Sequence, residues 1–396
     1  MHPNFIKPDY NSGGFAGLPD RIFRLAASGD YDAVVFFLVD GFGWRFFEKF
    51  QGHPFLSFLA KNGTVEKLTA QFPSTTTAHV TTLHTGLPVG ESGLYEWYIY
   101  DPLLDAIYAP LLFSLSGTTE RDTLKSSGVK PKDLYPTQTL YNKLKGSGVK
   151  SHFFQSKAYT PSTYSNVVNR GCDLQPYRTL PEALTHIRQL LEKQKRPAYI
   201  GLYYDTLDGI SHPHGPASEQ IEAEILAFLA VMQALFARTL ASSGKRVCFL
   251  MTADHGQVDV NPDTTIYLNR DKRFAGIEDF LAVNRAGQPL IPAGSARDLF
   301  LHLRPDRLDE ARAFLASRLD GVADVVKSAD LIEGGWFGEK ISQRFKERVG
   351  NLVVLPYAGQ SVWWYEKERF EMKFRGHHGG LTPQEIEIPL VTLELG

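Results

Sequence analysis

Four short segments of continuous hydrophobicity constrain the fold of this chain more than any other feature. Each is a run of β-branched, aromatic or other apolar residues that ends abruptly in polar residues. Continuous rather than alternating hydrophobicity is typical of a strand that is buried on both faces of a sheet. The four segments are YDAVVFFLVDGFG (31–43), VKSHFFQSKAY (149–159), RPAYIGLYYDTLDG (196–209) and KRVCFLMTADHG (245–256).

Helical patterns lie between these segments, as in residues 179–194 and 218–242. Such alternation predicts an α/β fold with a three-layer αβα architecture. In this architecture, helices cover both faces of a doubly wound, mostly parallel central sheet. Residues 262–370 break the rhythm with strand and helix signals of their own, and IEIPLVTLEL near the C-terminus returns to the buried-strand pattern. We therefore predict a core formed by residues 1–261 and 371–396, with residues 262–370 inserted as a lid.

Composition narrows the class of protein. The 396 residues carry a formal net charge of −2, so no basic excess exists to neutralise the backbone of a nucleic-acid polymer. The two cysteines, Cys172 and Cys248, form neither a disulfide framework nor a CxxC zinc motif. The N-terminal residues lack a signal-peptide pattern, and no uninterrupted apolar run reaches the ~18 residues that span a membrane. We expect a cytoplasmic protein without a membrane partner.

Three of the predicted strands end in acidic residues. Asp40 follows the first strand, Asp205 and Asp208 follow the third, and the pair Asp254-His255 follows the fourth. In open α/β sheets the ligand crevice lies outside the carboxyl ends of the strands, so this fold brings these side chains to one edge.

Further histidines extend this set. His212 lies four residues after Asp208, and His377 and His378 stand in the motif RGHHGG. Each feature alone has an ordinary interpretation, since an aspartate after a strand commonly forms a turn or caps a helix. Together they favour a site for zinc or a related divalent ion, and carboxylate-rich sites of this kind often hold two ions.

The stretch FPSTTTAHVTTLHTG (72–86) contains seven hydroxyl side chains in fifteen residues. Threonine loses χ1 freedom inside a helix, so this composition indicates either a polar surface segment or a hydroxyl that is placed for chemistry.

Five ordered blocks of the sequence resemble the alkaline phosphatase superfamily and, within it, the type I phosphodiesterase/nucleotide pyrophosphatase family. The resemblance runs through most of the chain and is weakest in the lid and between residues 103 and 200. The blocks are LVDGFGW (38–44), FPSTTTAHVTTLHTGLPVGESGL (72–94), DTLDGISHPHGP (205–216), TADHGQ (252–257) and GHHGG (376–380).

The resemblance implies an alkaline phosphatase-like fold that holds two divalent metal ions. Zinc is the expected metal, and manganese or iron suit the same ligands. One ion would be held by Asp40, Asp254 and His255, together with the nucleophile. The other would be held by Asp208, His212 and His378.

The nucleophile implied by the resemblance is a threonine. In the family pattern F-P-[ST]-x-T the reactive residue is Thr76, with Thr75 and Thr77 as alternatives one residue away. A coordinated dication lowers the pKa of a hydroxyl and supplies an alkoxide, which implies a phospho-threonine intermediate. The segment resembles the first turns of a helix, whose N–H groups favour a phosphoryl oxygen.

The sequence departs from the family pattern at two positions. Trp97 stands where nucleotide pyrophosphatases have an asparagine that binds a phosphoryl oxygen, and His79 stands where an asparagine often follows the nucleophile. Both changes weaken the inference of a nucleotide substrate, but not the metal core. The family places its ligand histidine directly before a glycine, which selects His378 and makes His377 a neighbour. Asp205 is expected to be an orienting or capping residue rather than a metal ligand.

We therefore expect a phosphoric ester hydrolase, either a phosphodiesterase or a nucleotide pyrophosphatase, that acts on a small phosphate ester such as a nucleotide. An alternative on the same metal core is a phosphomonoesterase or phosphonate hydrolase, in which Lys373 or Arg375 would hold the additional charge. A non-catalytic binding protein of the same fold is disfavoured, because every expected ligand position holds a competent residue. The sequence does not predict the oligomeric state.

Overall fold

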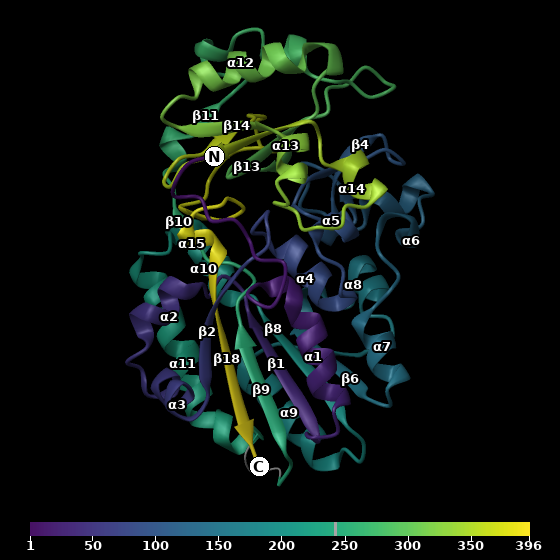
Figure 1. The fold of residues 1–396 in the computed structure, drawn as a ribbon, viewed down its shortest axis with the longest axis vertical. Helices are drawn as coiled ribbons and strands as arrows, with labels where there is room; N and C mark the ends of the chain where they lie inside the picture. Colours follow the sequence, from purple (N-terminus) through teal and green to yellow (C-terminus); the bar gives the residue numbers. More distant parts are fainter. Residues whose placement is uncertain (241–243) are drawn as a thin grey trace.

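The computed structural model describes residues 1–240 and 244–396, and a seven-stranded sheet lies at its centre (Figure 1). Each of the four hydrophobic segments forms a strand of this sheet, and IEIPLVTLEL supplies another. The spatial order is β2 (Thr64–Thr69), β18 (Glu387–Leu395), β9 (Val247–Thr252), β1 (Ala33–Val39), β8 (Ala198–Tyr204), β6 (Lys150–Ser156) and β7 (Asp173–Tyr177).

The sheet is mostly parallel, as predicted. The five neighbouring strands from β9 to β7 run in one direction, and β18 is antiparallel to both of its neighbours. β1 and β9 are buried along their whole length, which explains their continuous hydrophobicity.

Helices cover both faces of the sheet and complete the three layers (Figure 1). On one face α1 contacts α4 and α7, and on the other α11 contacts α3, α9 and α10. Their bounds are α1 (Leu18–Ala27), α2 (Trp44–Phe50), α3 (Pro54–Asn62), α4 (Thr76–Thr85), α5 (Val89–Ser92), α6 (Pro131–Leu134), α7 (Leu140–Gly146), α8 (Thr163–Val168), α9 (Leu180–Lys193), α10 (Thr206–His214), α11 (Glu219–Leu240) and α15 (Pro383–Ile386).

The helix expected over 218–242 corresponds to α11, and residues 241 and 242 of that expectation lie outside the described residues. By length and composition alone α11 could cross a membrane, with a mean hydropathy of 1.6. In the sequence, Glu219, Glu222 and Glu224 interrupt the apolar pattern at the start of this helix. In the structure the inner face of α11, including Ile225, Phe228 and Met232, belongs to the main core.

The threonine-rich stretch forms α4. Thr75 caps its first turn by accepting a hydrogen bond from the backbone N–H of Ala78 at 3.4 Å, and Gly86 ends it with a φ of 73°. Nearly all of α4 is buried, so this segment is an interior helix rather than a polar surface.

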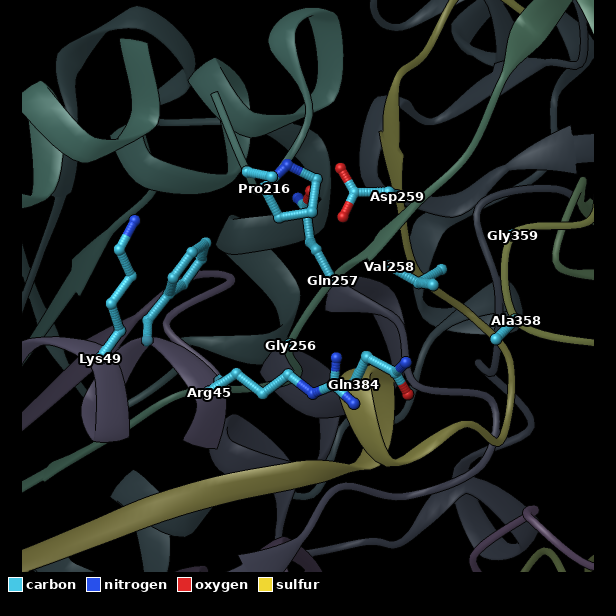
Figure 2. A pocket seen from close by; sticks show the side chains of 13 residues that line it. Arg45, Lys49, Pro216, Gly256, Gln257, Val258, Asp259, Ala358, Gly359 and Gln384 are labelled. Carbon is cyan, nitrogen blue, oxygen red and sulfur yellow. The ribbon is translucent and has the colours of Figure 1, made fainter. Parts of the chain in front are cut away.

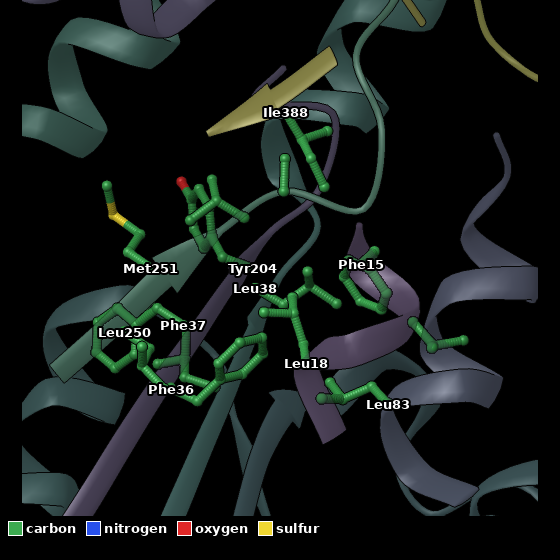
Figure 3. Close-up of a cluster of buried hydrophobic side chains, with 14 of the residues drawn as sticks. Phe15, Leu18, Phe36, Phe37, Leu38, Leu83, Tyr204, Leu250, Met251 and Ile388 are labelled. Atoms are coloured by element: carbon green, nitrogen blue, oxygen red, sulfur yellow. The ribbon is translucent and has the colours of Figure 1, made fainter. Parts of the chain in front are cut away.

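The main core lies between the sheet and its helices (Figure 3). Phe36 and Phe37 of β1 lie beside Leu250 and Met251 of β9, and all four are fully inaccessible to solvent. This packing fixes the ends of β1 and β9, from which Asp40 and Asp254 follow.

Residues 262–370 lie beyond the carboxyl ends of the parallel strands (Figure 1, top). They contain an antiparallel sheet in the order β12 (Ala293–Ser295), β13 (Asp298–Leu301), β15 (Leu352–Pro356) and β14 (Ala323–Lys327). The helices of this part are α12 (Leu308–Arg318), α13 (Ser328–Glu333) and α14 (Gln343–Arg348).

Alternate residues of this second sheet belong to different cores. Phe300 and Val353 pack into the main core, whereas Leu299 and Leu352 join a second cluster with Leu315 of α12. Side chains on a strand alternate between faces, so one face of the lid sheet packs on the body of the protein. The boundaries 262 and 370 stay a prediction.

The remaining strands form smaller sheets of two or three strands. They are a three-stranded sheet of β3 (Ile99–Asp101), β4 (Ala106–Ala109) and β5 (Ser114–Leu115), the pair β10 (Val258–Asp259) with β17 (Gly376–His377), and the pair β11 (Ile266–Tyr267) with β16 (Val362–Trp363).

Candidate active site

The fold brings the predicted site residues together at the carboxyl ends of the parallel strands. Asp40 follows β1, and Asp254 and His255 follow β9. Asp208 and His212 lie on α10, which begins directly after β8. The two remaining residues come from the first turn of α4 and from the residue after β17; they are Thr76 and His378.

One group of candidate metal ligands consists of Asp40, Asp254 and His255, with one possible ligand atom of each within 4.8 Å of the others. His255 Nε2 lies 3.4 Å from Asp40 Oδ1 and 3.5 Å from Asp254 Oδ2. The same nitrogen lies 3.2 Å from Thr76 Oγ1. All three ligands are buried.

A second group adjoins the first. Asp208, His255 and His378 each place a ligand atom within 4.8 Å of the others, and the rings of His255 and His378 stack with centroids 3.6 Å apart. His212 is not part of this triplet, but its Nε2 lies 3.1 Å from Asp208 Oδ2. His255 therefore belongs to both acid–histidine groups and connects them.

Gly41 allows this close approach. Its φ is 71°, and a Cβ there would come within 3.3 Å of the Asp208 Cα, so a side chain would be strained and crowded. The Gly41 N–H donates to Asp254 Oδ1 at 3.1 Å. The glycine thereby links the ends of β1, β8 and β9.

Burial and charge set the protonation of these groups. Burial, followed by repulsion from Asp254, raises the pKa of Asp40 well above its ordinary value, and burial also raises the pKa of Asp254. Burial lowers the pKa of His255 to about 4 and that of His378 to about 3. Burial alone would raise the pKa of Asp208, but the neighbouring histidines, His212 foremost, hold it below its ordinary range.

These residues fit divalent metal ions. Within the described chain, the buried oxygens Asp40 Oδ1 and Asp254 Oδ2 have no hydrogen-bond partner, which is costly unless a cation compensates them. Both face the neutral imidazole of His255. Neutral imidazoles and carboxylates are the donors that zinc and related dications take.

Hydrogen bonds made by Nδ1 orient the imidazoles of His212 and His378. His212 Nδ1 lies 2.9 Å from the carbonyl oxygen of Gly376, and His378 Nδ1 lies 2.9 Å from that of Ser74. In both rings the Nδ1–H donates to the carbonyl, which leaves the Nε2 lone pair directed at the site. This arrangement is typical of histidine ligands to metals.

The comparison with known families is decisive. The family described as type I phosphodiesterase / nucleotide pyrophosphatase matches residues 34–381. The chain belongs to this family.

Curated relatives match part of the sequence, and solved structures share the fold. Venom phosphodiesterases 2 and 1 of Crotalus adamanteus are each 28% identical over 244 residues, or 59% of this chain. The matched region covers 28% and 27% of those relatives, so the chain corresponds to about a quarter of their length. Murine ectonucleotide pyrophosphatase/phosphodiesterase 5 shares the fold with a TM-score of 0.66 at 18% identity, over 91% of this chain and 87% of that one. The human protein gives the same TM-score at 16% identity, with the same coverage of both chains.

The structure separates the three candidate threonines of the phosphodiesterase family motif. Thr75 is occupied as the cap of α4, and its hydroxyl donates to the carbonyl of Tyr95 at 2.8 Å. Thr77 is buried without a hydrogen-bond partner among the described residues. Thr76 is the one whose hydroxyl lies beside His255, which supports it as the nucleophile.

Two neighbouring histidines have structural roles. His79 accepts from the Gln71 N–H through Nε2 at 2.7 Å, and its Nδ1–H donates to the Thr75 carbonyl at 2.7 Å. This histidine therefore holds the start of α4. His377 Nδ1 accepts from the backbone N–H of His378 at 2.9 Å, which agrees with its expected role as a neighbour.

Asp205 occupies the cap position of α10, but its side chain makes no capping bond there. It lies instead against the hydroxyl of Tyr159. The expectation that it orients or caps is thus met only by its position at the helix start.

The departure from the family pattern at Trp97 has a structural consequence. The Trp97 side chain is 40% exposed, and its backbone N–H donates to the Glu96 carboxylate. Glu96 is buried against Ser295 and Asp298 of the lid, and burial raises its pKa to about 7. The loop that carries Trp97 in place of the family asparagine therefore packs against the lid.

Two further residues of the site were not singled out from the sequence. The Tyr203 hydroxyl donates to Asp40, and the Gln257 side-chain amide donates to Asp208. Gln257 lies in the TADHGQ block, so its place two residues after His255 was the available signal. Tyr203 looked like an ordinary core aromatic within a buried strand.

A cavity of about 520 Å³ borders this site without containing it (Figure 2). Gly256 and Gln257 line it, together with Arg45 and Lys49, but none of the seven predicted site residues does. It therefore lies beside the acid–histidine groups and does not include Thr76.

Proposed function

We propose that the protein is a phosphodiesterase or nucleotide pyrophosphatase that uses two divalent metal ions, most readily zinc, and Thr76 as its nucleophile. The observation that carries this proposal is the position of the Thr76 hydroxyl, 3.2 Å from His255 Nε2, where two acid–histidine groups meet. The family membership supports the reaction class.

The residues divide into two ligand sets. Asp40, Asp254 and His255 would hold one ion beside Thr76. Asp208, His212 and His378 would hold the other. When bound, such ions lower the pKa of the attacking hydroxyl and neutralise charge on the phosphoryl group.

The start of α4 supports Thr76 as the nucleophile. Thr76 is the first residue of this ten-residue helix, so backbone N–H groups and the positive end of the helix dipole would face a phosphoryl oxygen bound there. Attack by the Thr76 oxygen on phosphorus and departure of the ester oxygen would leave a phospho-threonine, which water then hydrolyses.

The substrate we propose is a small phosphate ester, such as a nucleotide. An inactive variant of murine ectonucleotide pyrophosphatase/phosphodiesterase 5 has been solved in complex with AMP, which supports this choice. The low net charge argues against a nucleic-acid polymer. A cytoplasmic location stays a prediction.

A phosphomonoesterase is less well supported. It needs a cation for the additional phosphoryl charge, and Lys373 is instead paired with Glu371 at 2.9 Å, with 72% of its side chain exposed. A solvated pair of this kind offers little to a phosphoryl group.

The test compares Thr76→Ala with Thr77→Val, using bis-nitrophenyl phosphate and nitrophenyl phosphate as substrates. Thr76→Ala should lower turnover at least about a thousandfold and keep the metal. Thr77→Val preserves shape one residue away and should keep turnover within a few-fold. Loss of activity in Thr77→Val with activity retained in Thr76→Ala would contradict the assignment.

A further inference from the structure

The two ligand sets differ in how well the protein covers them. The side chains of His255 and Asp254 are completely buried, whereas that of His212 is 18% exposed. The second set thus lies nearer to the solvent, and His212 is its least protected member.

One aromatic side chain covers His212. The ring of Phe374 stacks on it with centroids 4.3 Å apart and an interplanar angle of 27°. The edge of the same ring meets His377 at 5.4 Å and 77°. Phe374 is itself 41% exposed, so core packing does not explain its placement.

The segment that carries Phe374 forms backbone hydrogen bonds with residues on both of its sides. The Arg375 N–H donates to the His212 carbonyl at 2.8 Å, and the Val260 N–H donates to the Arg375 carbonyl at 2.8 Å. Gly376 accepts from His212 Nδ1. This segment therefore contacts the carbonyl of His212, its Nδ1 and one face of its ring.

The same segment reaches the lid. The Met372 N–H donates to the Tyr267 hydroxyl at 2.9 Å, and the Met372 side chain packs in the second hydrophobic cluster. Four residues further along, the segment enters β17, and His378 follows that strand. The lid and the second ligand set are thus connected by residues 372–378.

We propose that Phe374 is a positioning residue for the second metal ion, because its ring fixes the orientation of His212 and shields that imidazole from water. This inference rests on the proposed function. Groups that orient metal ligands typically change metal affinity by about 10- to 100-fold. A stacked ring with no hydrogen bond belongs at the lower end of that range.

The experiment titrates zinc into metal-free protein by calorimetry, and repeats the titration with cobalt to follow its visible absorption. The parent should bind two ions, and Asp208→Asn should lose one binding phase, which identifies the second site. Phe374→Ala should weaken that phase alone by about tenfold and change its cobalt spectrum. Phe374→Tyr keeps the stacking ring and should restore both.

Phe58→Ala is the matched control, since Phe58 is 42% exposed on α3. Two ions in the parent with an unchanged second phase in Phe374→Ala would overturn this inference and leave the proposed function intact. An equal loss in Phe58→Ala would also overturn it. Fewer than two ions in the parent would instead overturn the two-metal site and, with it, this inference.

Discussion

Replacing Glu96 by glutamine should change the pH dependence of stability. Glu96 and Asp298 are both almost completely buried, and Glu385 adds further negative charge near Asp298. Burial raises the pKa of Glu96 from 4.5 to about 7. The folded protein therefore keeps a proton that the unfolded chain releases.

The direction and the size follow from this difference. Between pH 4.5 and about 7 the native state binds more protons at Glu96 than the unfolded state does, so stability falls as pH rises through this window and levels off above it. At about 1.4 kcal/mol per pH unit, the loss attributable to Glu96 is about 3 kcal/mol. Glutamine has a similar shape and no proton to lose, so Glu96→Gln should remove that part of the decline.

Urea unfolding at pH 5 and pH 8, with chelator present so that metal binding does not contribute, measures the effect. The stability of Glu96→Gln relative to the parent should increase by about 3 kcal/mol between the two pH values. Glu339→Gln, at an exposed glutamate, should show no such change. A difference between Glu96→Gln and the parent that is the same at both pH values would refute the reasoning.

Three further predictions concern the metal ligands and the buried charges. Asp208→Ala or His378→Ala should each lower the metal content by about one ion per chain in elemental analysis, and unchanged stoichiometry would exclude these residues as ligands. Tyr203→Phe, which removes the hydroxyl that donates to Asp40, should weaken binding of the first ion by about tenfold in a metal titration; an unchanged affinity would show that this bond orients nothing. Arg297→Met should lower the free energy of unfolding by about 3–5 kcal/mol, because it leaves Glu385 buried without its partner at 2.9 Å; a loss below about 1 kcal/mol in chemical denaturation would contradict this.

The central strands could be predicted because their burial is visible in the sequence. β1 and β9 are buried at every position, so their hydrophobicity is continuous. The edge strands β2 and β7 were not predicted, since most of their residues are exposed or half-buried. An edge strand is specified by its single neighbour rather than by its own pattern.

The ligand residues could be predicted from their positions after strands, but their supporting contacts could not. Tyr203 lies opposite Leu38 in the pairing of β8 with β1, and this register brings its hydroxyl to Asp40. Nothing in the run IGLYY indicates that register. The fastening of Glu96 to Asp298 likewise depends on how the lid sheet packs, which is a property of distant segments.

The most direct test of the account is metal content by elemental analysis, measured on the same preparation as hydrolysis of bis-nitrophenyl phosphate and nitrophenyl phosphate. We expect two ions per chain and faster turnover of the diester. Absence of bound metal and of turnover, even after zinc or manganese is added, would contradict it.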